Sequence, residues 1–107
     1  MLFWAGAAFA LTPEATEFLE ISKKLEPVQC EKRKLRREIA LAEIERRDAS
    51  ELRKRFSRLD RDPETARLEK RLAELEPRIL DGKGAPRHPE DLEAISLQQR
   101  QAFYRCE

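Results

Sequence analysis

Residues 28–62 form the longest stretch of this chain without a proline or a glycine. The two residue types that most readily end a helix are therefore absent from it. Its apolar residues recur at steps of three, four and seven, which is typical of a helix that buries one face; they are Leu35, Ile39, Ala42, Ala49, Leu52, Phe56 and Leu59. We predict one long helix over 27–61, about 52 Å in length. Its packing seam should be weakest at 46–50, where the sequence is mostly polar.

Three prolines mark where helices begin. Each is preceded by Thr12, Asp62 or His88 and followed by a glutamate. Proline suits the first helical position, and an acid there faces the positive end of the helix dipole. Thr12 and Asp62 are good N-caps, whereas His88 is a poor one. The expected helices are 13–26, 27–61, 63–80 and 89–106.

This pattern predicts an all-α fold, either an elongated antiparallel helical hairpin or a small three- to four-helix bundle with one long helix. Charged residues make up 40% of the 107 residues, so the chain can bury a narrow seam rather than a thick core. Residues 12–107 are expected to form a single helical domain.

Two cysteines, Cys30 and Cys106, are the only ones in the chain. If the chain reverses at Asp60–Pro63 and the last two helices run back along the long one, Cys106 reaches Cys30. A disulfide between them would close a ring of 77 residues. The alternatives are two unpaired thiols in a cytosolic protein and intermolecular pairing through Cys106. A metal site or a catalytic thiol fits less well, because there is one histidine and no close ligand pair.

Residues 1–11 are uncharged, and Ala8-Phe9-Ala10 matches the small-x-small pattern that precedes signal-peptide cleavage. We interpret 1–11 as an apolar segment that is a possible signal-peptide remnant, which predicts a periplasmic or secreted protein; the alternative is a cytoplasmic one. The segment could instead pack on the domain or anchor it at a membrane surface. It is too short for a transmembrane span.

Catalytic motifs are missing from the sequence. It contains no nucleophile elbow, phosphate-binding loop, metalloprotease helix or dinucleotide-binding turn. We expect no enzyme activity, no cofactor, no metal and no small-molecule substrate.

Two basic clusters lie in the long predicted helix, where residues 28–62 carry a net charge of +4. Phosphate contacts could come from Lys32, Arg33, Lys34, Arg36 and Arg37 and from Arg53, Lys54 and Arg55. A solvated helix face is the simpler interpretation, because the whole chain carries only +1 and no aromatic residues alternate with the cations. Nucleic acid is therefore an unlikely partner. A cytosolic protein that binds nucleic acid through this face is the alternative function.

Some apolar residues fall off the main stripes. Leu41 and Ile44 lie beside the Leu35–Ala42 line, and Phe103 and Tyr104 form an aromatic pair near the chain end. Such surfaces bind partner helices or a second copy of the chain, unless the first helix covers Leu41 and Ile44. We expect a small exported protein that binds another protein, as an adaptor, a chaperone or an assembly subunit.

The overall plan resembles small periplasmic helical proteins with two cysteines. The ending Gln98–Cys106 also resembles that of lysozyme-inhibitor-like domains, but its spacing is shorter and the upstream cysteines of those domains are absent. No functional residue is carried over from either resemblance.

Overall fold

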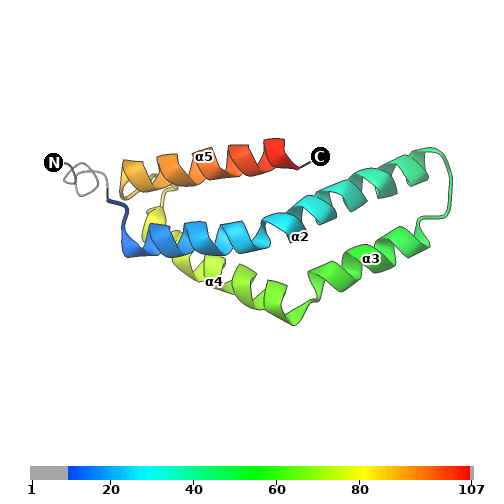
Figure 1. Ribbon diagram of the computed structural model, residues 1–107, viewed down its shortest axis with the longest axis horizontal. Helices are drawn as coiled ribbons and strands as arrows, with labels where there is room; N and C mark the ends of the chain where they lie inside the picture. Colours follow the sequence, from blue (N-terminus) through cyan, green and yellow to red (C-terminus); the bar gives the residue numbers. More distant parts are fainter. Residues whose placement is uncertain (1–9, 107) are drawn as a thin grey trace.

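The computed structural model describes residues 10–106. It is an elongated all-α structure of 60 × 26 × 26 Å with one long helix (Figure 1), which confirms the predicted fold class. The helices are α2 (Pro13–Ile44), α3 (Ser50–Asp60), α4 (Pro63–Ile79) and α5 (Pro89–Arg105). The three predicted proline starts are correct, and Thr12 and Asp62 cap their helices through side-chain oxygens, as expected. The His88 side chain makes no capping hydrogen bond.

The long helix is α2, so the prediction of a break before Pro27 was wrong. Pro27 lies inside the helix on an exposed position. Its missing N–H leaves one backbone carbonyl without a helical partner. Buried Leu25 and Leu35 lie on either side of it, so packing holds both halves in one helix. The ribbon of α2 bends partway along its length (Figure 1), as a helix does at an internal proline.

The predicted helix over 27–61 is interrupted at 45–49, which is the second correction. Arg46 has φ 57°, the left-handed conformation that often ends a helix. The Arg47 N–H donates to the Ala42 carbonyl at 2.7 Å and closes the end of α2. The carboxylate of Asp48 then accepts from the backbone N–H of Ser50, which begins α3. The short polar sequence at 45–49 therefore both ends α2 and begins α3.

This turn, rather than Asp60–Pro63, is where the chain reverses. From it α3 and α4 run back along α2 in succession; we call these two helices the returning leg. Residues 61–62, between α3 and α4, only bend this leg (Figure 1). The loop after α4 then lets α5 run parallel to the first half of α2. As a result the last described residue lies beside the middle of α2 rather than at either end of the molecule.

Buried side chains divide the molecule into two parts. The first part, which we call the base, is where α4 and α5 pack on the first half of α2. Its core cluster consists of Ile21, Leu25, Leu68, Leu75, Ile79 and Ile95. The second part, which we call the arm, consists of residues 31–60, where α3 packs on the second half of α2. Its buried apolar side chains are Leu35, Ala42 and Ala49. Two of these are alanines, so the two helices of the arm approach closely near its tip.

Candidate protein-binding surface

Helix α5 is held on α2 by three polar contacts in a constant register. They pair Thr12 with Asp91, Leu19 with Gln98 and Glu26 with Arg105. Each pair is 79 residues apart in sequence, and successive pairs are seven residues apart on both helices. A repeat of seven keeps one face of a helix against its neighbour. The contacts therefore fix α5 as a parallel neighbour of α2, from its first turn to its last.

The register ends at a disulfide. Cys30 and Cys106 are bonded with their Cα atoms 5.5 Å apart, and neither cysteine is free. The predicted pairing is confirmed, although the chain reaches it by a different route. Since α5 stops here, it does not extend along the arm. The disulfide is therefore the boundary between the base and the arm.

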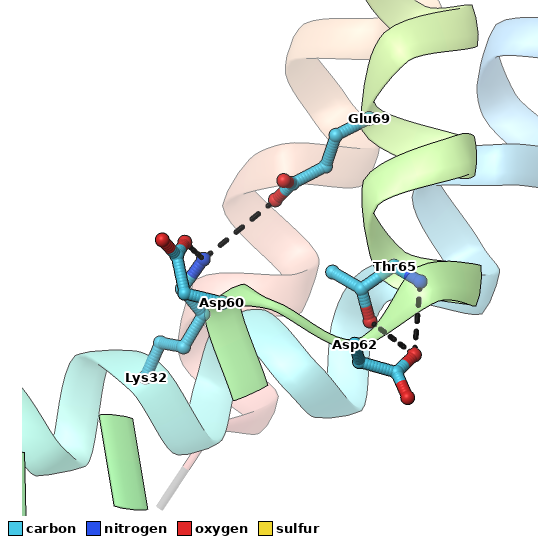
Figure 2. A network of polar contacts seen from close by, with 5 residues as sticks. All are labelled: Lys32, Asp60, Asp62, Thr65 and Glu69. Carbon is cyan, nitrogen blue, oxygen red and sulfur yellow. Dashed lines mark hydrogen bonds and ion pairs between the residues drawn. The ribbon is translucent and has the colours of Figure 1, made fainter. Parts of the chain in front are cut away.

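Lys32 stands just beyond the disulfide and is a buried cation, 6% exposed. Its ammonium group donates to Asp60 at 2.8 Å and lies 3.7 Å from Glu69 (Figure 2). One partner closes α3 and the other belongs to α4. Lys32 thus links all three helices at the point where the returning leg bends. Beside it, Asp62 caps α4 by accepting from the N–H of Thr65, as Figure 2 also shows.

Five of the described carboxylates have pKa values below their usual range, and Asp60, Glu17 and Asp81 are three of them. Hydrogen bonding to Lys32 lowers the pKa of Asp60, and hydrogen bonding to Arg71 lowers the pKa of Glu17. Backbone N–H groups of the α4–α5 loop lower the pKa of Asp81, that of Lys83 first. Each carboxylate is held more strongly in its charged form when the chain is folded.

Stability should consequently fall in acid. A lowered folded-state pKa gives a contribution that is complete above the unfolded-state value, near pH 4, and is lost as the pH falls through the folded-state value. We expect the melting temperature to be nearly constant from pH 7 to about 5 and to drop below about 4. Thermal scans at each pH measure this. A variant with Asp60→Asn and Glu17→Gln should show a shallower drop, and a wild-type curve that stays flat in acid would contradict these assignments.

Apolar side chains are exposed near the tip of the arm. Leu41 is 48% exposed and Ile44, the last residue of α2, is 77% exposed. The alternative in which the first predicted helix covers them does not arise, because that helix is the beginning of α2 itself.

A second exposed apolar group lies at the end of α5. The rings of Phe103 and Tyr104 meet edge to face with centroids 5.6 Å apart, and Tyr104 is 75% exposed. The guanidinium of Arg33 stacks on the ring of Phe103, 5.1 Å from its centroid. The aromatic pair therefore lies beside Arg33 of α2. Ile44 lies eleven residues further, about 16 Å along the helix axis.

The four predicted partner-binding residues therefore form two separate apolar spots. Leu97 on α5, which was not among the predicted residues, is a fifth exposed large apolar side chain of the described chain. A signal for it existed: it follows buried Ile95 by two residues and so points away from the α2 side of the helix.

The predicted basic residues do not act as one free surface. Lys32 is buried in the contacts described above, Arg53 pairs with Glu43, and Arg55 pairs with Glu31 at 3.3 Å. Arg33 and Arg36 stack on Phe103 and Phe56. Most of these cations hold α3 and α5 against α2, which is a structural role.

The hollows of the described surface are open and rich in charged groups. One of about 710 Å³ lies at the bend between α3 and α4 and is lined by the cations Arg53, Lys54, Arg58 and Arg61. Within residues 10–106, no three acidic, histidine or cysteine side chains are placed to hold a metal ion together. Over the same range, no helix has the length and apolar character that a membrane crossing needs.

Comparison of the chain with protein-family models, with curated proteins and with solved structures finds no match.

Proposed function

We propose that this chain is a non-catalytic helical protein of the periplasm or the secreted fraction that acts by binding another protein, as an adaptor, a chaperone or an assembly subunit. The observation that carries the proposal is the exposure of apolar side chains in two separate spots: Ile44 near the arm tip and Tyr104 at the end of α5. Grouped exposed apolar side chains are typical of surfaces that bind proteins.

Export is supported by the disulfide. Disulfide bonds persist in oxidising compartments and are rare in the cytosol. The bond between Cys30 and Cys106 contains both cysteines of the chain, so no thiol remains for another role. In this proposal residues 1–11 carry the export signal. Nearly all of that segment, residues 1–9, lies outside the described residues.

The architecture supports binding through a helix face. The base is closed by a core cluster, three polar contacts and a disulfide, whereas the arm is a two-helix projection with a thin seam. An amphipathic partner helix can lie along such a projection and cover apolar side chains spaced along it. Arg33, which stacks on Phe103 in one of these spots, would border the partner.

Nucleic-acid binding is the weaker candidate. Three of the eight predicted phosphate-binding residues, Lys32, Arg53 and Arg55, are already in ion pairs with acidic side chains. Engaging phosphates would require breaking contacts that hold the arm together.

A photo-crosslinking experiment tests the proposal. A photoreactive phenylalanine analogue is placed at Ile44, at Tyr104 or at exposed Glu38, which serves as the matched control on α2, and the chain is expressed in its native host. We expect positions 44 and 104 to capture the same protein and position 38 to capture none. An adduct of twice the mass of the uncrosslinked chain would identify the partner as a second copy. Equal capture at all three positions, or none, would contradict the proposal.

The affinity of the identified partner then gives a quantitative test. Ile44→Glu should weaken binding by about tenfold or more, because truncating a central apolar contact costs roughly 1–2 kcal/mol and a charge adds a desolvation cost. Glu38→Ala should change the affinity little. Circular dichroism should show unchanged helix content in both variants, because neither side chain is buried.

A further inference from the structure

Helix α5 covers one side of α2 in the base, and that side of α2 continues into the arm. Glu26 pairs with Arg105 and Cys30 is bonded to Cys106, so these two positions of α2 face α5. A step of seven residues returns to nearly the same side of an α-helix, with a drift of about 20°. Steps of seven from Glu26 and from Cys30 therefore indicate which arm residues lie on the α5 side of α2.

Five residues of the arm lie on this side. Four of them are seven or fourteen residues beyond Glu26 or Cys30, and the fifth follows one of these by four residues, about one turn. We call them the arm face: Arg33, Arg37, Ala40, Leu41 and Ile44. The first of them shows that the register is correct, because the guanidinium of Arg33 stacks on Phe103 at the end of α5.

Beyond Arg33 the arm face is exposed. Helix α3 packs on the other side of α2, where Ala42 is buried, and Ile44 lies about 200° round the helix from Ala42. Arg37 and Ala40 are exposed, and Leu41 is about half exposed. In Figure 1, α5 and α3 lie on opposite sides of α2, and α5 ends pointing along the arm. The arm face is thus the part of the α5 side of α2 that α5 does not cover.

The size and shape of the arm face fit a short helix. It extends over eleven residues, about 16 Å or three turns of α2. Its apolar residues, Ala40, Leu41 and Ile44, are grouped towards the arm tip, whereas its two arginines lie towards the base. A helix laid in line with α5 would cover both groups, as an amphipathic helix does when it packs by one face.

Charge indicates which kind of helix fits. Residues 28–62 carry a net charge of +4, and the two glutamates nearest to Ile44 are already paired, Glu43 with Arg53 and Glu45 with Arg47. Among residues 10–106, Arg37 forms no ion pair. A second copy of the chain would bring the same arginines to the arm face, and like charges that meet across an interface are unfavourable. An acidic partner would instead be complementary.

We propose that the arm face binds an acidic amphipathic helix of another protein, which lies along α2 in line with α5 and places a carboxylate against Arg37. This inference rests on the proposed function, and it adds the chemistry of the partner and the side of the arm that holds it.

Photo-crosslinking along the arm tests the position. The photoreactive phenylalanine analogue is placed at Ala40 or Leu41 in the native host, with Glu38 and Arg58 as exposed controls on other sides of the arm. We expect Ala40 and Leu41 to capture the protein that Ile44 captures, and the controls to capture none. Capture at Ile44 without Ala40 and Leu41, or an adduct of the chain with itself, would overturn this inference and leave protein binding standing. Capture at no position would overturn both.

Mass spectrometry of the adduct then identifies the captured segment. We expect a segment with an apolar stripe at helical spacing and a net negative charge. A basic or uncharged segment would overturn the inference, although the chain would still be a binding protein.

Charge reversal tests the contact with Arg37. A synthetic peptide of the captured segment is titrated into the purified chain, and the affinity is measured by fluorescence anisotropy. Arg37→Glu should weaken binding by about tenfold or more, while Arg58→Glu, the same change of charge on α3, should weaken it by less than about twofold. Circular dichroism should show both variants folded, because both side chains are exposed. A peptide in which lysine replaces the glutamate or aspartate opposite Arg37 should recover most of the affinity for Arg37→Glu. Equal weakening by the two variants, or no recovery, would overturn the contact.

Discussion

Reduction of the bond between Cys30 and Cys106 is expected to lower the free energy of unfolding by about 4.5 kcal/mol, the chain-entropy value for a ring of 77 residues. Small domains are stable by only about 5–15 kcal/mol, so this is a large fraction of the total. The physical reason is that the bond restricts the unfolded chain far more than the folded one, in which α5 is already docked. Guanidinium unfolding of the oxidised and reduced chain measures the difference.

The double variant Cys30→Ser with Cys106→Ser provides the control. It should match the reduced wild-type chain, and reducing agent should not change it further. Hydrogen exchange should rise first in α5, which contributes a single residue, Ile95, to the core cluster. Equal stability of the oxidised and reduced chains would show that the bond does not hold the base closed.

The second large effect is expected in the core of the base. Leu75 of α4 is fully buried among the side chains of the core cluster. Leu75→Ala removes that burial and leaves a cavity, which costs about 2–5 kcal/mol in comparable sites. The measurement is denaturant unfolding with the disulfide intact. Leu41→Ala is the matched control: the same substitution on a half-exposed side chain should cost less than about 1 kcal/mol. Similar losses in the two variants would contradict the described packing.

The fold class and the helix starts could be predicted because they depend on local chemistry. A proline at the first helical position, after a capping side chain such as Thr12 or Asp62, specifies a helix start with little reference to the rest of the chain. The cysteine pair could also be predicted, since an antiparallel path brings the chain end back towards the middle. The bond formed although the reversal occurs at 45–49 rather than at 60–63. From the turn at 45–49, α3 and α4 together run back past the arm to the beginning of α2. Helix α5 then runs in the opposite direction along the first half of α2, so Cys106 ends beside Cys30.

The boundaries of the long helix could not be predicted, because one tertiary effect and one unfavoured backbone conformation override the simple helix rules. Packing around buried Leu25 and Leu35 retains a helix through Pro27, at a position where an internal proline costs about 3 kcal/mol. In contrast, Arg46 adopts a left-handed conformation that glycine would take more easily. The polar sequence at 46–50 was a real signal of a weak seam. It did not by itself indicate that the helix would end there.

The candidate surface was only partly visible in the sequence. Apolar spacing indicated that Leu41 and Ile44 leave the main stripe, and both are exposed in the structure. Spacing could not show that Lys32, within a basic cluster, is buried against Asp60 and Glu69, because those partners come from α3 and α4. Such contacts depend on how helices distant in the sequence are placed side by side.

Peptide mapping without reduction tests the central claim most directly: that the end of α5 is bonded to the middle of α2 within one chain. The chain is isolated from its native host with free thiols blocked and is digested with trypsin. We expect a single linked species that joins Leu25–Lys32 to the fragment beginning at Cys106, from a protein that runs at the mass of a single chain. Blocked thiols on both cysteines, or a link between two copies of the chain, would contradict it.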